Sequence, residues 1–194
     1  DLIGTGSPEF TSVIPNRMFR NSEGKSFEEV TSAGGFGHIQ KGHGVGFADL
    51  DNDGDQDIYT VLGGAYEGDN YPNICFENPI SKNNWIILKL EGVESNRSAI
   101  GAQLKLDLQN GRSIYYSINT GGSFGANSLQ AEIGIGSSKL IDTLTIRWPN
   151  SKAQIFKRIE GNKKYKLVEG ENKLVEEPYQ KIQLIGREIM QHHN

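Results

Sequence analysis

The strongest constraint on the fold is a pair of alternating segments joined by an Asn-Gly turn. Residues 102–118 read AQLKLDLQNGRSIYYSI, in which apolar and polar residues alternate on both sides of Asn110-Gly111. A period of two is typical of β-strands with one buried face, and Asn-Gly is the strongest short-range signal for a hairpin. The segment therefore predicts an antiparallel β-hairpin.

Similar strand signals recur through the second half of the chain, at residues 85–91, 143–148, 152–158 and 165–168, with a turn predicted at 149–151. Sustained helical periodicity is absent before the C-terminal tail. Short strands at this spacing favour an all-β sandwich or barrel. The 24 glycines among 194 residues suit the many tight turns of such a fold.

Composition excludes several classes of protein. The 20 Lys and Arg against 24 Asp and Glu give a net charge of −4 and a pI near 5.6, which argues against a nucleic-acid binder with a basic face. No run approaches the ~20 apolar residues that a membrane-spanning helix needs. The one cysteine, Cys75, excludes an internal disulfide and any multi-cysteine zinc site.

The densest chemistry lies in residues 48–59, ADLDNDGDQDIY, where an aspartate recurs at every second position: Asp49, Asp51, Asp53, Asp55 and Asp57. Their charges repel one another unless a cation neutralises them. A cation that accepts about six to eight oxygens suits this donor set, which favours Ca²⁺ over Mg²⁺. We expect the first three aspartates to point at one ion. Asp55 is expected to coordinate through its backbone carbonyl with its side chain free, and Asp57 to close the shell.

An EF-hand begins in the same way but ends differently. It requires a bidentate Glu at the last position of the loop and a helix on each side, whereas Thr60 occupies that position here. The flanks GHGVGFA (42–48) and IYTVL (58–62) are typical of strands. The sequence therefore predicts a calcium loop between β-strands. We expect a structural ion, because a closed shell of protein oxygens leaves no position for a substrate; a solvated acidic turn without an ion is the alternative.

The aspartate loop and the residues before it resemble a known repeat. The pattern DxDxDGxxD follows the segments PNRMFRN (15–21) and FEEVT (27–31), and residues 15–62 are together similar to the FG-GAP (VCBS-type) repeat of integrin-like β-propellers. The resemblance implies a calcium loop within a propeller blade. The ligands it implies are the side chains of Asp49, Asp51, Asp53 and Asp57 and the carbonyl of Asp55. A propeller needs about four or more blades, so one visible repeat indicates a fragment of a longer protein or a stand-alone variant.

The second half of the chain resembles a different family. Four motifs occur in order: NRSAIGA (96–102), GGSFG (121–125), IGIG (133–136) and IRWP (146–149). They make residues 84–171 similar to the ASPIC/UnbV domain, which commonly follows FG-GAP repeats in secreted proteins, including the cartilage acidic protein group. The resemblance implies a secreted, cell-surface or periplasmic location.

The predicted organisation has four parts. Residues 1–10 match a vector-derived tail, 11–80 an FG-GAP-like calcium-binding segment, 81–171 an ASPIC/UnbV-like domain and 172–194 a C-terminal tail. The predicted fold is all-β: a propeller-blade-like segment with a calcium loop, packed on an antiparallel β-sandwich or barrel. In the tail, Ile182, Ile185 and Ile189 fit either a short helix or a final extended segment.

The leading functional hypothesis is a calcium-binding, non-enzymatic extracellular module for adhesion or for recognition of a glycan or protein. Candidates for the recognition surface are Tyr59, Tyr66, Tyr71 and Trp85, although aromatic residues of β domains more often lie in the core. A second hypothesis is a structural cap for the rest of a larger propeller protein.

The rival hypothesis is a secreted metal-dependent or serine hydrolase acting on a polysaccharide or ester. Residues 121–125 match G-x-S-x-G around Ser123. A nucleophile elbow requires a strand before the serine and a helix after it, whereas residues 128–136 are typical of a strand. The motif therefore favours a tight glycine turn over a catalytic serine.

Overall fold

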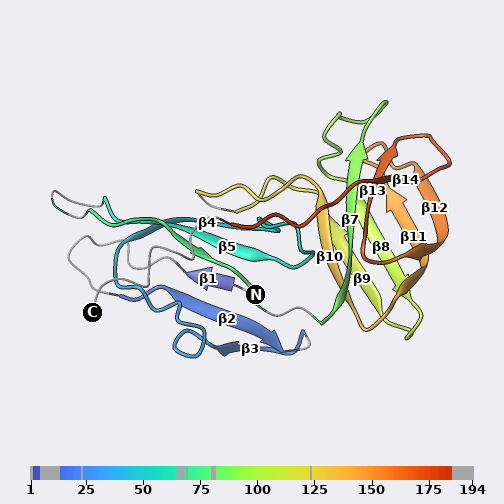
Figure 1. The fold of residues 1–194 in the computed structure, drawn as a ribbon. Helices are drawn as coiled ribbons and strands as arrows, with labels where there is room; N and C mark the ends of the chain where they lie inside the picture. Colours follow the sequence, from blue (N-terminus) through green and yellow to red (C-terminus); the bar gives the residue numbers. More distant parts are fainter. Residues whose placement is uncertain are drawn as a thin grey trace. The chain divides into compact units, whose positions relative to one another are not determined.

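The computed structural model describes residues 2–4, 14–22, 24–64, 68, 70–79, 82–122 and 124–184. Every regular element among these residues is a β-strand, which confirms the predicted all-β class (Figure 1). None of the described segments forms a helix long and apolar enough to cross a lipid bilayer.

The chain divides into two compact units. The first comprises the described residues within Asp1–Phe47, Ile58–Phe76 and Gly121–Ala126, and the second those within Ala48–Asp57, Glu77–Thr120 and Asn127–Asn194. The aspartate loop thus packs with the second unit, although the sequence interpretation grouped it with residues 11–80. The predicted domain boundaries along the chain stay predictions.

The second unit is a sandwich of two four-stranded sheets. One sheet has the order β10-β7-β13-β14 and contains Asn84–Glu91 (β7), Ala131–Gly136 (β10), Lys163–Val168 (β13) and Val175–Glu177 (β14). The other has the order β12-β11-β8-β9 and contains Gln103–Leu108 (β8), Ser113–Ser117 (β9), Leu140–Arg147 (β11) and Ala153–Glu160 (β12). Neighbouring strands are antiparallel except β7 and β13, which pair in parallel. The predicted sandwich is confirmed, and the described strands form no closed barrel.

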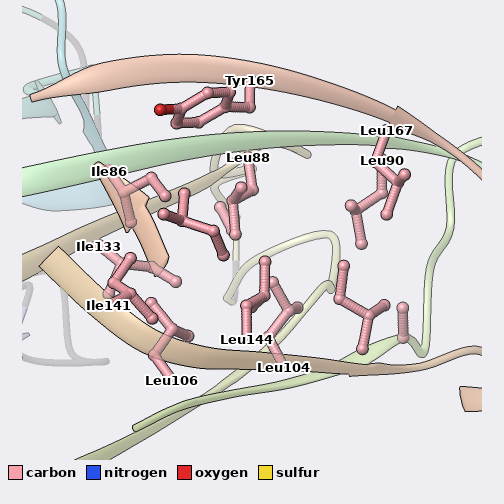
Figure 2. Close-up of a cluster of buried hydrophobic side chains, with 14 of the residues drawn as sticks. Ile86, Leu88, Leu90, Leu104, Leu106, Ile133, Ile141, Leu144, Tyr165 and Leu167 are labelled. Carbon is pink, nitrogen blue, oxygen red and sulfur yellow. The ribbon is translucent and has the colours of Figure 1, made fainter. Parts of the chain in front are cut away.

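The sandwich core forms because alternating strands turn their apolar residues to one side. Side chains from both sheets face one another in Figure 2, among them Ile86 and Leu88 of β7 and Leu106 of β8, which are at most 1% exposed. Leu144 of β11 and Leu167 of β13 are buried in the same cluster. Burying one such side chain contributes about 1.5–3 kcal/mol, so this cluster is the main source of the unit's stability.

The predicted hairpin is formed by β8 and β9, with Gln103 opposite Ser117. At the turn, Leu108 donates its N–H to the carbonyl of Arg112 (2.8 Å) and accepts the N–H of Gly111 (3.0 Å). Of the Asn-Gly pair, Gly111 alone has a positive φ, 80°. Glycine adopts this φ at little cost, which explains why the turn forms here.

The carboxylate of Glu169, directly after β13, fixes the backbone of the loop that follows β7. Its Oε2 accepts the backbone N–H groups of Val93, Glu94 and Ser95 at 2.8–2.9 Å. Its Oε1 accepts the Ser95 hydroxyl (2.9 Å) and the Asn150 amide (2.7 Å). Burial acts to raise the pKa of Glu169, but these donors outweigh burial and lower the pKa to about 2. The carboxylate therefore accepts hydrogen bonds from five donor groups that would otherwise need water as their partner.

The first unit contains two three-stranded sheets. One has the order β1-β2-β3 and the other the order β4-β5-β6. Their strands are Leu2–Gly4 (β1), Arg17–Ser22 (β2), Ser26–Glu29 (β3), Gly42–Ala48 (β4), Asp57–Leu62 (β5) and Ile74–Phe76 (β6). The strand β1 lies within the segment interpreted as vector-derived; the origin of that segment stays a prediction.

The C-terminal tail continues without regular structure from β14 to Leu184. The backbone N–H of Ile182 donates to the carbonyl of Asp51 (2.6 Å), so the tail meets the aspartate loop. The sequence predicts either a short helix or an extended segment for the tail. Residues 178–184 contain no helix and so fit the extended segment. Ile185 and Ile189 lie outside the described residues.

Candidate metal centre

The aspartate loop runs from the end of β4 to the start of β5. Asn52 (φ 59°) and Gly54 (φ 97°) adopt positive φ and so reverse the chain within a few residues. Asp49 closes the turn: its Oδ1 accepts the N–H of Asp53 (2.9 Å) and its Oδ2 accepts the N–H of Gly54 (2.7 Å). Asp49 is therefore both a cap of the turn and a candidate ligand.

Asp57 holds the other end of the loop. It is 1% exposed, and both of its carboxylate oxygens accept backbone donors. Oδ2 accepts the N–H of Leu50 (3.0 Å) and Oδ1 the N–H of Asn78 (2.9 Å). These two bonds fix the direction of a carboxylate that would otherwise turn to solvent.

Three of the five predicted ligands come together. One carboxylate oxygen from each of Asp49, Asp51 and Asp57 lies within 4.8 Å of the other two, and all three residues are buried. Oxygens that coordinate one Ca²⁺ at about 2.4 Å lie no more than about 4.8 Å apart. The spacing is therefore compatible with one shared ion.

Asp53 and Asp55 are arranged differently. Asp53 accepts the N–H of Asp55 through Oδ1 (3.2 Å) and the ammonium of Lys181 through Oδ2 (2.7 Å). Both carboxylate oxygens of Asp55 are buried and have no hydrogen-bond partner among the described residues; Oδ1 of Asp51 shares this state. The Asp55 side chain, which the sequence predicts to be free while the backbone carbonyl coordinates, is therefore buried. Its role as a ligand stays a prediction.

The electrostatics follow from this crowding. Burial raises the pKa of Asp55 to about 7, and the charges of the four other aspartates add to the shift. Burial also raises the pKa of Asp49, against the donors that bind it. Burial acts in the same direction on Asp53, but the hydrogen bonds from Lys181 and Asp55 and the charge of Lys181 together outweigh burial and leave the pKa below its ordinary value. The loop therefore carries more negative charge than its own donors compensate.

The donor set fits a hard divalent cation. Buried carboxylate oxygens without a partner are costly, and Asp51 and Asp55 together supply three of them. Carboxylate and carbonyl oxygens are the ligands that Ca²⁺ prefers. We find no nitrogen or sulfur donor in the buried cluster of three that would favour a transition metal.

Two residues at the loop were not found from the sequence. The Tyr179 hydroxyl donates to Oδ2 of Asp49 (2.7 Å), and the Lys181 ammonium lies 3.1 Å from Oδ2 of Asp51 and 2.7 Å from Oδ2 of Asp53. Burial together with the bond to Asp49 raises the pKa of Tyr179, and the two carboxylates raise the pKa of Lys181. No local pattern marks either residue, since each lies well over one hundred positions from its partner.

Two protein-family models match the chain. The family model described as an FG-GAP-like repeat matches residues 1–60, and the model described as ASPIC and UnbV matches residues 92–174. The chain carries an FG-GAP-like repeat followed by an ASPIC and UnbV domain. The resemblance inferred from the sequence is thereby confirmed, and both are β modules typical of extracellular proteins. No curated protein matches the chain.

The G-x-S-x-G motif lies within the residues matched by the ASPIC and UnbV model. Ser123 itself lies outside the described residues. The segment is preceded by β9 and followed by β10, so a strand stands where a nucleophile elbow requires a helix. A Cβ on Gly125 would overlap the carbonyl of Val45, and Gly121 has a φ of 95°. Close backbone packing and turn geometry therefore account for these glycines.

The aromatic candidates fall into different units. Tyr59 and Tyr71 belong to the first unit and Trp85 to the second, while Tyr66 lies outside the described residues. The Trp85 ring lies 5.4 Å from the Tyr179 ring at an interplanar angle of 58°. Because Tyr179 also binds Asp49, Trp85 lies beside the aspartate loop.

Proposed function

We propose that the chain is a calcium-binding, non-enzymatic module for extracellular recognition or adhesion. The observation that supports this is the convergence of buried carboxylate oxygens from Asp49, Asp51 and Asp57 within 4.8 Å. These three residues would hold the ion, with Asp53 and Asp55 completing the donor set. Bound calcium would supply the positive charge that the crowded loop lacks.

The role of the ion in this proposal is to order the loop. The carboxylates of Asp49 and Asp57 are already directed by backbone donors, whereas that of Asp51 has no such donor among the described residues and is the one the ion would fix. What remains uncompensated is charge, because Asp51 and Asp55 bury oxygens without partners. Extracellular modules of this kind bind calcium with a Kd of about 10⁻⁴–10⁻³ M, and we expect an affinity in that range.

Recognition is proposed to use a hollow of about 600 Å³ beside the loop. Its walls include Trp85, Tyr179, Asn52, Asp53 and Asn162. An aromatic surface flanked by amide and carboxylate groups suits a glycan ring or a polar peptide segment. Because Asn52 and Asp53 belong to the aspartate loop, ordering that loop would also fix one wall of the hollow.

The test is thermal unfolding in 10 mM CaCl₂ and in EDTA, combined with calorimetric titration of calcium (~10 mM is about 10–100 times the expected Kd). Wild type should gain about 1.4–2.7 kcal/mol of stability from calcium. Asp51→Asn should lose most of this gain, because it removes a ligand charge without changing shape. Asp142→Asn, an exposed position on β11, is the matched control and should behave as wild type. Equal melting of wild type in calcium and EDTA would exclude the proposal.

A further inference from the structure

The last described segment of the chain lies across the aspartate loop. We call residues 178–184 the strap. Tyr179 and Lys181 bind side chains of the loop, and Ile182 donates its N–H to the backbone carbonyl of Asp51 (2.6 Å). The strap therefore contacts both carboxylates and backbone of the loop proposed to bind calcium.

Lys181 places a positive charge against Asp51 and Asp53, two of the aspartates proposed to hold that ion. Its ammonium bridges Oδ2 of Asp51 and Oδ2 of Asp53, at 3.1 and 2.7 Å. The Asp51 side chain is only 4% exposed, whereas that of Lys181 is 60% exposed. The ammonium therefore reaches a buried carboxylate from the solvent side, as an entering cation would.

The single ammonium of Lys181 leaves several carboxylate oxygens of the loop without a partner. Oδ1 of Asp51 and both oxygens of Asp55 remain buried without a hydrogen-bond partner among the described residues. An ammonium has only three donors and one charge, and the aspartates of the loop number five. The unsatisfied oxygens indicate that the loop is built for a cation of higher charge than Lys181 provides.

We propose that Lys181 competes with calcium inside the molecule. The ammonium and a divalent ion exclude each other at Asp51 and Asp53, because two cations cannot share these oxygens without strong repulsion. Calcium binding therefore releases Lys181, and a docked Lys181 lowers the apparent calcium affinity. This inference rests on the proposed calcium site.

The strap has a second anchor that calcium does not displace. Tyr179 binds Asp49 through a neutral hydroxyl and packs on the Trp85 ring, so it carries no charge to repel the ion. Lys181 lines both the hollow beside Trp85 and a second hollow of about 450 Å³ that includes Glu77 and Asn78. Release of Lys181 therefore removes a shared wall of the two hollows while Tyr179 keeps the strap attached.

The first experiment compares calcium affinities of the full chain by calorimetric titration. Lys181→Gln should bind calcium about three- to tenfold more tightly than wild type, since it removes the competing charge. Lys163→Gln is the matched control: Lys163 lines the same hollow but pairs with Glu160 and Glu176. It should change the affinity less than about twofold. Lys181→Arg keeps the charge and should stay near wild type.

The second experiment needs no variant. Wild-type protein is treated briefly with an amine-acylating reagent in calcium or in EDTA, and the labelling of each lysine is measured by mass spectrometry. Calcium should accelerate acylation of Lys181 and leave Lys163 unchanged.

The outcomes separate the two proposals. If wild type binds calcium but Lys181→Gln binds it no more tightly, or if Lys163→Gln gains as much, the competition is refuted and the calcium site stands. Unchanged labelling of Lys181 in calcium-bound protein leads to the same conclusion. If neither wild type nor Lys181→Gln binds calcium, the proposed function fails and the competition fails with it.

Discussion

The hydroxyl of Tyr179 donates a hydrogen bond to Oδ2 of Asp49 over 2.7 Å, joining residues 130 positions apart in the chain. The same side chain packs against Trp85 at 5.4 Å between ring centroids, and the Lys164 ammonium lies 5.5 Å from its ring. Tyr179 therefore combines a directed polar contact with aromatic packing. With Lys181 and Ile182, it is one of the residues through which the strap and the aspartate loop stabilise each other.

Replacing Tyr179 with Phe should separate these two contributions. The ring remains for packing on Trp85, while Asp49 loses one hydrogen bond to its carboxylate. A hydrogen bond to a charged group contributes about 1.5–3 kcal/mol, so we expect Tyr179→Phe to lower the free energy of unfolding by about that amount in EDTA, measured by urea denaturation. Tyr115→Phe, at a side chain 73% exposed on β9, should have no measurable effect. Equal stabilities of the two variants would show that the hydroxyl is dispensable.

The aspartate loop also depends on the absence of a side chain at Gly54. A Cβ there would overlap the indole of Trp85, and φ is 97°. Gly24 has a similar φ of 73° but nothing within 4 Å of an added Cβ. Both substitutions by alanine incur the cost of positive φ, about 1–2 kcal/mol, but Gly54→Ala must also displace an aromatic ring.

We therefore expect Gly54→Ala to lower the free energy of unfolding by about 3 kcal/mol or more and Gly24→Ala by about 1 kcal/mol. Denaturation followed by circular dichroism measures both. The difference between the variants isolates the steric part, so similar losses would mean that Trp85 moves away without cost.

The sequence predicts those features of the fold and of the site that depend on short-range patterns of residues. Alternation predicts the strands around Leu88 and Leu106, and the regular spacing of acids predicts that Asp51 belongs to a cation site, because both signals lie within about ten residues. The contacts of Tyr179 and Lys181 cannot be predicted from such patterns. Each is one residue in a tail without periodicity, and its partner is fixed by the folded sandwich.

The pairing of β7 with β13 shows the same limit at the level of the sheet. The two strands lie in parallel, with Leu88 opposite Tyr165 and Leu90 opposite Leu167. Alternation predicts each strand but not its neighbour, since a parallel pair needs a crossover connection that leaves no local turn signal. The sequence therefore predicts a sandwich that is antiparallel throughout, and this pair is the exception.

The buried carboxylate of Asp55 predicts a dependence on pH in the absence of calcium. Its pKa rises from an ordinary value of 3.8 to about 7 in the folded protein. The folded state therefore holds a proton that the unfolded state releases, and stability in EDTA should fall as pH rises from about 4 to 7. Asp55→Asn carries no charge at any pH and should escape this loss.

At pH 8 in EDTA, Asp55→Asn should melt above wild type by roughly 2–4 °C, the shift that about 1 kcal/mol gives in a chain of this size. Below pH 4 the two should melt together, and saturating calcium at pH 8 should reverse their order. A variant that melts below wild type in EDTA at pH 8 would refute the idea that repulsion acts on Asp55.

Glu169 should show the opposite dependence on pH. Its pKa is lowered from an ordinary value of 4.5 to about 2, because five donors favour the charged form. The unfolded state therefore binds a proton more readily between these values. The stability that Glu169 contributes is fully present above about pH 5 and is lost as pH falls toward 2.

Glu169→Gln removes the charge but keeps the shape and one acceptor oxygen. At pH 7 we expect a loss of about 2–3 kcal/mol, since the N–H groups of Val93, Glu94 and Ser95 keep a weaker partner or none. Urea denaturation in calcium-free buffer from pH 7 to pH 2.5 measures the difference from wild type, which should shrink steadily below pH 5. Glu171→Gln, at an exposed position in the same turn, is the control and should follow wild type throughout. A loss that persists undiminished at pH 2.5 would mean that Glu169 acts through its shape and not through its charge.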